Sequence, residues 1–425
     1  MKFTTYLTPI TTLTGLLMLF LLQCNNADSQ KLTNWPCFHG PDRTNKSIET
    51  GLLKKWPAGG PKLLFTISGL GEGYSSVSFG EGMIFTAGKL KDQSYVFAFD
   101  LNGKPVWSSP NGKAWATTAS WASSYTGSRS TPTYDNGRLY CLSEAGRLAA
   151  YDAKTGNEIW AKDLPKEFDA PQTEYGYAES VYIEGNRLYV RPSGKKGFLV
   201  CLNKDDGKLI WANTDIPGGE GYTSAVVFDF GGFKHLTGSS SDCYFGVDIV
   251  TGKLLWKVDF KNQQGLNLTD VVVKDGDVLI SSDYGKGSIL VRLKKSGSAF
   301  IPETVWESKL MDNHHGGVIL HNGYLYGSGT SSRGWFCLDF LTGKQMWNQT
   351  RGKGSITYAE GMLYLLDERS GVMSLIKASP EKYELISEFN IPSGGQSLYW
   401  AHPVISGKRL YVRHWDKVFV YDIGL

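Results

Sequence analysis

Residues 247–256 read VDIVTGKLLW, an apolar strand that ends at Asp248, a turn rich in Gly and Lys, and a second strand that reaches Trp256. The same phrase returns at residues 151–160 (YDAKTGNEIW) and 338–347 (LDFLTGKQMW). A phrase that repeats at a steady interval is typical of a repeat architecture, in which each copy is one supersecondary unit. These copies therefore decide the fold.

Altered copies fill the intervals. The copy at Trp107 is one residue shorter, the copy at Trp211 has Asn in place of the strand-ending Asp, the copy at Trp306 carries an insertion, and residues 375–386 lack the Trp. The steps between successive Trp residues from Trp107 to Trp347 are 53, 51, 45, 50 and 41 residues. A period of about 40–50 residues is expected for the blades of a β-propeller.

Each copy follows a pair of short apolar strands joined by a tight turn. Examples are residues 181–190, 271–280, 319–326 and 404–412, with Glu-Gly, Asp-Gly, Asn-Gly and Ser-Gly at the turns. Such dipeptides supply the positive φ angles that two-residue hairpins require. Each unit therefore reads as four antiparallel strands, which is one propeller blade.

The eighth copy is split between the two ends of the chain. Residues 418–422 (VFVYD) end it, and residues 61–65 (PKLLF) supply the missing strand. The sequence predicts an all-β, eight-bladed β-propeller of four-stranded antiparallel blades, with the ring closed by pairing the N-terminal strand with the C-terminal blade. Closure of this kind removes the exposed edge strands of an open array.

The Trp and Asp positions that recur in each copy of the phrase have structural interpretations. The Trp side chains are expected to pack between neighbouring blades, where a flat aromatic ring fills the gap between two twisted sheets. The Asp before each turn is expected to accept hydrogen bonds from the turn backbone rather than to bind calcium.

Bulk composition narrows the functional classes. The 425 residues include 50 Gly, 13 Trp and 22 Tyr, and 44 basic side chains stand against 41 acidic ones, for a net charge of +3. Nucleic-acid surfaces need a concentrated basic stripe, and no run of Lys or Arg exceeds two residues. We therefore expect no nucleic-acid partner.

The N-terminus has the layout of an export signal. Lys2 precedes an apolar stretch at residues 13–22, which is too short to span a bilayer comfortably as a helix. Cleavage after Ser29 is one route of processing. Lipoprotein processing at Cys24 is the other, which would place one acyl anchor on the chain.

These patterns divide the chain into three parts. Residues 1–29 are interpreted as a signal peptide, with a lipoprotein signal ending at Cys24 as the alternative; residues 30–60 as an N-terminal extension; and residues 61–425 as the propeller. The protein is expected in the periplasm or cell envelope, attached to a membrane only through a lipid at Cys24, and as a monomer.

Five cysteines follow Cys24, and an odd number does not fit a fully paired disulfide framework. No spacing of Cys and His residues suggests zinc. The five are therefore expected to be small buried hydrophobic side chains: Cys37, Cys141, Cys201, Cys243 and Cys337.

The Asp-x-x-Thr-Gly-Lys-x-x-Trp phrase resembles the pyrroloquinoline-quinone (PQQ) type of propeller repeat from Trp35 onward. Residues 35–43 and 51–56, like residues 127–132 and 313–317, are similar to secreted PQQ-like propeller proteins of bacteria. Two kinds of relative represent the two functions that this resemblance implies. Quinoprotein alcohol dehydrogenases hold PQQ and calcium in the central funnel, whereas the propeller lipoprotein of the outer-membrane protein assembly machinery binds a partner and no cofactor. The adjacent Cys-Cys pair common in the dehydrogenases does not occur here.

The loops that enter the innermost strands of a propeller gather around its axis and form a natural pocket. Their polar and aromatic residues could bind a polar or anionic ligand, or could satisfy one another and ordered water. The candidate binding residues of this funnel are Glu72, Tyr74, Arg129, Glu179, Tyr222, Asp270, His314, His315 and His402.

Two features of the funnel have alternative interpretations. His314 and His315 could supply a general base or a metal ligand, but side chains of adjacent residues point in different directions, which favours a structural hydrogen-bonding role. The long segment from Ser108 to Tyr125 could cap the funnel, present aromatic side chains to a partner, or cover a blade edge.

The sequence thus favours an exported binding or scaffold protein of the cell envelope, with a small polar ligand or a protein partner at the funnel face. The alternative is a quinoprotein-like oxidoreductase that uses PQQ and Ca²⁺. No catalytic residue and no metal ligand is assigned by a motif.

Overall fold

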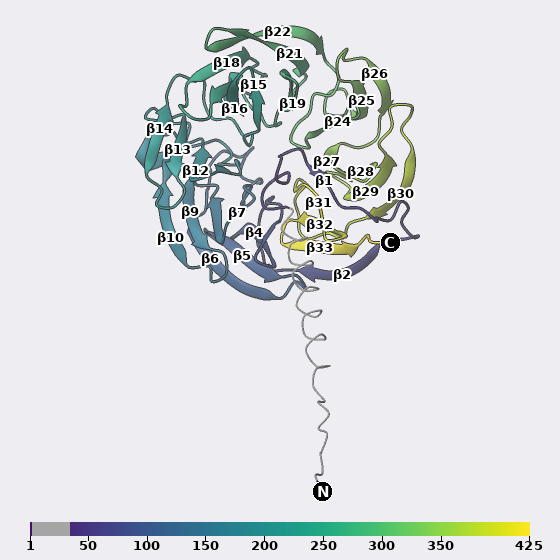
Figure 1. Ribbon diagram of the computed structural model, residues 1–425. Helices are drawn as coiled ribbons and strands as arrows, with labels where there is room; N and C mark the ends of the chain where they lie inside the picture. Colours follow the sequence, from purple (N-terminus) through teal and green to yellow (C-terminus); the bar gives the residue numbers. More distant parts are fainter. Residues whose placement is uncertain (2–34) are drawn as a thin grey trace.

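A computed structural model of the chain describes Met1 and residues 35–425. The predicted signal peptide, including Cys24 and Ser29, lies outside the described residues apart from Met1. Eight sheets are arranged in a ring, each running from the axis to the rim (Figure 1); seven have four strands, and the sheet of blade 7 gains a fifth from the N-terminal side of the chain. The prediction of an all-β, eight-bladed propeller is confirmed.

The first four blades follow the chain in order, and in each the first strand is innermost. Their strands are β3 (Ser78–Gly80), β4 (Met83–Leu90), β5 (Gln93–Asp100) and β6 (Pro105–Lys113) in blade 1; β7 (Thr133–Asp135), β8 (Arg138–Leu142), β9 (Arg147–Asp152) and β10 (Glu158–Asp163) in blade 2; β11 (Tyr182–Glu184), β12 (Arg187–Val190), β13 (Leu199–Asn203) and β14 (Leu209–Asn213) in blade 3; and β15 (Val227–Phe230), β16 (Phe233–Ser239), β17 (Cys243–Asp248) and β18 (Leu254–Asp259) in blade 4. A single short helix, α2 (Leu164–Phe168), follows β10 within the described residues.

The last four blades complete the ring. Their strands are β19 (Val272–Lys274), β20 (Asp277–Ser282), β21 (Gly287–Ser296) and β22 (Ala299–Ser308) in blade 5; β23 (Val318–His321), β24 (Tyr324–Gly329), β25 (Gly334–Asp339) and β26 (Gln345–Gln349) in blade 6; β27 (Gly354–Ala359), β28 (Met362–Asp367), β29 (Val372–Lys377) and β30 (Leu385–Asn390) in blade 7; and β31 (Val404–Ser406), β32 (Arg409–His414), β33 (Lys417–Asp422) and β2 (Lys62–Ile67) in blade 8. In every blade the register between the third and fourth strands shifts at a bulge, which increases the local twist.

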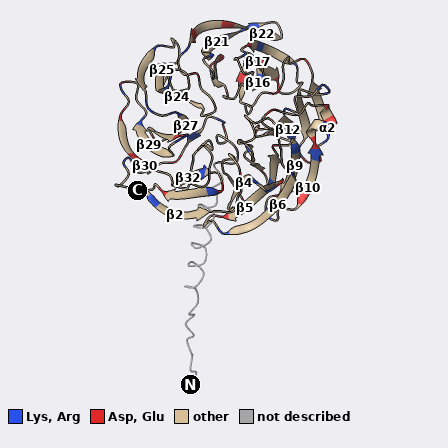
Figure 2. Cartoon of the chain, turned by 180° about the vertical axis from the view of Figure 1, so that it is seen from behind, with Lys and Arg blue, Asp and Glu red and all other residues tan. Residues whose placement is uncertain are grey.

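The ring closes where the two ends of the chain meet. Strand β2 pairs antiparallel with β33, with Lys62 opposite Asp422 and Ile67 opposite Val418. The fourth strand of blade 8 therefore comes from the N-terminal side of the propeller, as the split repeat predicted. Basic and acidic side chains are interspersed around the ring (Figure 2).

The hydrophobic core lies between blades rather than at one centre. A buried cluster fills each of the eight gaps between neighbouring blades within the described residues. Between blades 8 and 1, for example, Phe79 packs edge-on against Tyr411 with ring centroids 5.0 Å apart. The cores form a continuous circle, so every blade depends on both neighbours.

The repeated Trp locks one blade to the next. Its indole nitrogen donates to a backbone carbonyl of the following blade in four copies: Trp107 to Ala153 at 3.0 Å, Trp160 to Lys204 at 2.9 Å, Trp306 to Phe340 at 2.9 Å and Trp347 to Ser379 at 2.8 Å. In blade 4 the nitrogen of Trp256 instead meets His235 of its own blade at 3.1 Å, although the ring still belongs to the core between blades 4 and 5. The expected packing between blades is confirmed.

The repeated Asp organises the turn before the last strand. Asp152 accepts from the backbone nitrogens of Lys154 and Thr155, and Asp339 accepts from those of Leu341 and Thr342. The expectation that this Asp accepts hydrogen bonds from the turn backbone is confirmed. All five cysteines after Cys24 are free and buried, also as expected.

Residues 35–47, called here the N-terminal segment, run across the axis of the ring (Figure 1). Phe79 and Tyr134 donate their backbone N–H groups to the carbonyls of Trp35 and Pro36. Strand β1 (Lys46–Ser47) then pairs in parallel with the innermost strand β27 of blade 7. The segment thus ties blades on opposite sides of the ring together.

Arg43 extends these contacts to blade 3. Its side chain is 4% exposed and donates to the carbonyls of Ser180 at 3.0 Å and Val181 at 2.6 Å, at the start of blade 3. These bonds satisfy two carbonyls near the axis.

Within the described residues no helix is both long and apolar enough to cross a bilayer.

Glu360, in the β27–β28 turn, anchors the chain just after the N-terminal segment. Its carboxylate accepts from the backbone nitrogens of Leu52 at 2.9 Å and Gly51 at 3.1 Å and lies 2.9 Å from the Lys54 ammonium. These contacts, with the Leu52 bond foremost, lower the pKa of Glu360 to about 2.

Glu360→Gln is expected to lower stability in a pH-dependent way. Because the folded pKa lies below the value of 4.5 for an unperturbed Glu, the stabilisation is complete above about pH 5 and is lost as the pH falls towards 2. Urea unfolding of both proteins at pH 7 and at pH 2.5 measures this difference. Glu381→Gln, at an exposed turn, is the control, and an equal Glu360→Gln effect at both pH values would contradict the prediction.

Candidate functional site

A cavity of about 680 Å³ lies at the axis. It is formed by loops that enter the innermost strands, loops between the second and third strands, and the N-terminal segment. Eight aromatic side chains line it: Phe38, Tyr74, Trp121, Tyr125, Tyr175, Tyr222, Tyr284 and Trp400. Its polar lining consists of His39, Arg129, Glu174, Ser180, Ser224, Gln264, Asp270, His314, His315 and His402.

The N-terminal segment forms the floor. Phe38 and His39 line the cavity, and their rings stack with centroids 3.7 Å apart. A second cavity of about 240 Å³ shares His39, Asp270 and Gly317 with the first. The segment therefore divides the axial space in two, and the larger chamber has a closed floor.

A chain of hydrogen bonds across this floor determines the tautomers of its histidines. Nε2 of His402 lies 2.8 Å from the carbonyl of His315, and since a carbonyl only accepts, this nitrogen carries the proton. Nδ1 of His402 then accepts from Nε2 of His39 at 2.9 Å. Nδ1 of His39 faces Oδ2 of Asp270 at 3.5 Å, and Oδ1 of Asp270 accepts from the backbone of Ser224 at 2.7 Å. Burial holds the pKa of His402 well below 6.5, so His402 is neutral.

Flat aromatic faces form one wall. Trp400 stacks on Tyr125 with ring centroids 5.2 Å apart and an angle of 15° between the planes. Tyr74 lies 5.2 Å from Trp400 on another side, and its hydroxyl bonds Ser397 at 2.7 Å. Burial raises the pKa values of Tyr74 and Tyr222, so both phenols are neutral at physiological pH.

Arg129 brings a cation to the same chamber. Its guanidinium donates to the backbone carbonyls of Gly127 and Tyr125 and lies over the rings of Tyr74 and Trp115, 5.6 and 5.8 Å from their centroids. Desolvation lowers the pKa of Arg129, which means that burial penalises its charge. A half-buried cation held by carbonyls and aromatic faces retains capacity for an anionic group.

The cavity brings together seven of the nine candidate residues: Tyr74, Arg129, Tyr222, Asp270, His314, His315 and His402. Glu72 and Glu179 do not line it. Glu72 pairs with Lys89 at 2.7 Å and accepts from Thr126, and Glu179 accepts from the backbone of Arg191 at 2.8 Å. Both carboxylates support loops behind the cavity wall.

Other lining residues were missed by the sequence interpretation. Phe38 and His39 belong to the N-terminal segment, which has no place in the repeat register. Glu174, Tyr175 and Tyr284 lie in connections but outside the few residues that directly precede the innermost strands. The one available signal was the clustering of aromatic residues with Gly in these connections.

The long segment after blade 1 covers the funnel. Its first residues, from Ser108 to Lys113, belong to β6, so the loop is shorter than the sequence suggested. Trp115 is buried and donates to the carbonyl of Thr173 at 3.1 Å. Trp121, 63% exposed, donates to Glu174 at 2.7 Å, and both line the cavity with Tyr125. This placement agrees with a segment that caps the funnel, and the exposed Trp121 also agrees with one that presents an aromatic side chain to a partner.

The ring, its split eighth blade and its repeated Trp locks define a PQQ-like propeller. The model of the family described as outer membrane protein assembly factor BamB matches residues 92–349, which is more than half of the chain. The chain belongs to this family.

Individual relatives are distant. Outer membrane protein assembly factor BamB of Shewanella oneidensis is 25% identical over 265 residues, an alignment covering 58% of this chain and 64% of that protein. The chain thus aligns with less than two thirds of the length of this relative. BamB from Moraxella catarrhalis superposes with a TM-score of 0.59 at 14% identity, covering 85% of this chain and 99% of that one. A quinohemoprotein alcohol dehydrogenase from Comamonas testosteroni gives a TM-score of 0.61 at 12% identity over 95% of this chain and 82% of its own. These two likenesses show the fold.

The donor set of the cavity does not suit the calcium that quinoproteins hold. Calcium takes six to eight oxygen ligands. Of the two carboxylates that line the cavity, Glu174 accepts from Trp121, and Asp270 accepts from Ser224 through Oδ1, while its buried Oδ2 has no hydrogen-bond partner among the described residues. The remaining floor is histidine nitrogen, which calcium does not favour. PQQ itself carries three carboxylates, and Arg129 is the one arginine in the described lining. The described lining therefore does not fit PQQ with calcium.

Proposed function

We propose that this chain is an exported binding protein of the cell envelope that holds a small polar ligand in its funnel. The observation that carries the proposal is the cavity at the axis, with its aromatic walls and the N-terminal segment as its floor. Its volume lies within the range of about 300–1,000 Å³ that is typical of ligand sites, and polar groups converge on it. The export signal expected in residues 1–29, with cleavage after Ser29 or a lipid at Cys24, supports the location.

The lining favours a ligand with a planar face and an anionic group. Trp400 and Tyr125 offer flat surfaces, and Arg129 offers the cation. The neutral His402 adds a polar surface without charge. An anionic group at Arg129 would receive charge-assisted hydrogen bonds in a partly desolvated position.

Anilinonaphthalene sulfonate, a planar anion, is a suitable probe. We expect one dye per native protein, and Arg129→Gln and Trp400→Ala should each weaken its binding roughly tenfold. Arg351→Gln, an exposed arginine on the loop that enters blade 7, is the matched control and should leave the affinity unchanged. Fluorescence titration measures all four proteins; equal dye affinity in the wild type and both funnel variants would remove support for the proposal.

A protein partner at the same face is the second candidate. Related proteins are named as assembly factors of outer membrane proteins, and Trp121 stands largely exposed at the cavity. Exposed Trp side chains often contribute strongly to protein interfaces. Trp121→Ser should weaken capture of an envelope partner, whereas Trp400→Ala should mainly affect the small ligand.

A quinoprotein-like oxidoreductase remains the alternative derived from the repeat. The fold supports an oxidoreductase, whereas the lining of the cavity favours a binding protein. Reduction of a dye by the protein on addition of PQQ and Ca²⁺ would favour the oxidoreductase over the binding protein.

A further inference from the structure

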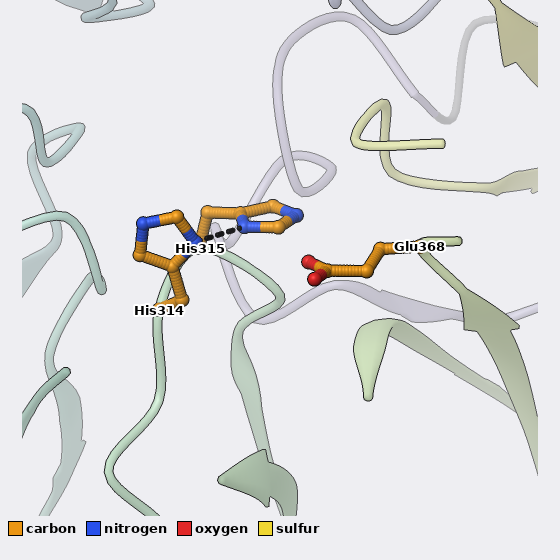
Figure 3. Close-up of side chains that lie close together, drawn as sticks. All are labelled: His314, His315 and Glu368. Carbon is orange, nitrogen blue, oxygen red and sulfur yellow. Dashed lines mark hydrogen bonds between the residues drawn. The ribbon is translucent and has the colours of Figure 1, made fainter. Parts of the chain in front are cut away.

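A histidine pair and a buried carboxylate meet at one side of the chamber. His314 and His315 lie on the loop that enters β23 of blade 6, and Glu368 follows β28 of blade 7 (Figure 3). One ring nitrogen of each histidine and one carboxylate oxygen of Glu368 all lie within 4.8 Å of one another. Two blades thus contribute to a compact set of nitrogen and oxygen donors.

The protons of the pair leave one nitrogen without a partner. Nε2 of His314 faces Oδ2 of Asp283 at 3.9 Å, which favours a proton on that nitrogen. Nδ1 of His314 is then the acceptor for Nδ1–H of His315 at 3.0 Å. Nε2 of His315 is therefore a bare lone pair, and it is buried with no hydrogen-bond partner among the described residues. A buried lone pair without a donor is costly unless something else binds it.

The charges around the pair are net negative. The side chains of Glu368 and Asp283 are 4% and 2% exposed, and Lys353 is the cation beside them, 3.3 Å from Glu368. The second oxygen of Glu368 accepts from the indole of Trp400 at 3.1 Å, which orients the carboxylate. Metals bind the neutral form of imidazole, and the two buried carboxylates favour a cation at this position.

We propose that His314, His315 and Glu368 bind a divalent transition-metal ion at the wall of the funnel. Two imidazoles and one carboxylate suit zinc, cobalt, nickel or ferrous iron rather than calcium or magnesium. Three protein ligands leave open positions, which face the chamber that His314 and His315 line. The proposal does not depend on the proposed ligand-binding function.

Metal binding requires a small closure of the three side chains, and Nδ1 of His314 must exchange its hydrogen bond from His315 for the metal. Bonds of about 2.1 Å in a tetrahedral site place the donor atoms about 3.4 Å apart. The donor atoms of His314, His315 and Glu368 lie up to 4.8 Å apart and must therefore move closer together. The closure competes with Lys353 for Glu368. Trp400 and Asp283 would act as outer partners that orient the ligands, as is common around metal sites.

Titration of the untagged full chain with Co²⁺ at pH 7.5 tests the site, with visible absorbance reporting the coordination and Zn²⁺ competing for it. We expect one ion per chain. His315→Gln and Glu368→Gln should each weaken the affinity at least roughly tenfold. His321→Gln, an imidazole at the end of β23 outside the cluster, is the matched control and should change the affinity less than about twofold.

Lys353→Met distinguishes a true site from a folding defect, because it should tighten Co²⁺ binding by roughly fivefold or more once the competing cation is gone. No stoichiometric Co²⁺ bound by the wild type, or equal affinities in the wild type and the His315 and Glu368 variants, would overturn the proposal. Weaker binding by Lys353→Met would also count against it.

Discussion

Gly252→Ala is expected to lower the free energy of unfolding by about 2–5 kcal/mol, although it adds a single methyl group. Gly252 lies in the β17–β18 turn of blade 4 with φ +74°, and a Cβ there would meet the ring of Trp211 at 2.5 Å. Trp211 comes from β14 of blade 3. The added methyl would therefore strain the turn and also push the indole out of the junction between two blades.

Gly323→Ala separates these two contributions. Gly323 has φ +84° in the β23–β24 turn, but a Cβ there meets nothing within 4 Å. This control carries the backbone strain alone, about 1–2 kcal/mol. Urea unfolding should show Gly252→Ala as the more destabilised by about 1–3 kcal/mol, and a double variant with Trp211→Leu should recover part of that difference. Equal costs at Gly252 and Gly323 would show that the Trp lock contributes little.

The same lock explains why the fold was predictable from the sequence. The phrase with Asp, Gly-Lys and Trp encodes three physical features at once: a turn capped by a carboxylate, a positive φ, and a ring that lies on the next turn. Because Trp107 lies on Gly156 and Trp306 on Gly343, the spacing of the phrase reports the spacing of the blades. The split copy likewise required β2 to pair with β33.

The funnel was predictable in position but less so in chemistry. Repeat register places the loops that enter the innermost strands near the axis, which is why His314 and Tyr222 line the chamber. Register does not determine where a side chain points. Glu179 has the expected position, yet the Arg191 backbone draws its carboxylate away from the cavity.

The parts of the site that lie outside the repeat could not be placed from its pattern. His39 reaches the floor because the N-terminal segment crosses the ring, and no periodicity describes that path. Glu368 follows the second strand of blade 7, and its approach to His315 depends on the packing of two blades. Such contacts between distant residues require the three-dimensional structure.

Arg413→Ala is expected to destabilise the junction that closes the ring, by about 3 kcal/mol or more. The Arg413 side chain extends from β32 of blade 8 and is 2% exposed. Its guanidinium donates to the carbonyl of Ser75 at 3.1 Å, the hydroxyl of Thr86 at 3.0 Å and the carbonyl of Ala87, all on the blade 1 side.

Two opposing effects decide the size of this loss. Burial lowers the pKa of Arg413, which shows that its charge is penalised, and removing the charge relieves that penalty. Truncation also leaves the acceptors of blade 1 buried without a donor, at about 1–3 kcal/mol each, and opens a cavity. Because several acceptors are affected at once, the loss of their hydrogen bonds outweighs the relief of the charge penalty.

Arg409→Ala is the control, because Arg409 lies on the same strand and donates to Leu101 of blade 1 from a less buried position. Its replacement should lower the free energy of unfolding in urea by less than about 1 kcal/mol. A similar small cost for Arg413 would mean that β2 and the apolar core between blades 8 and 1 hold the ring closed without this arginine.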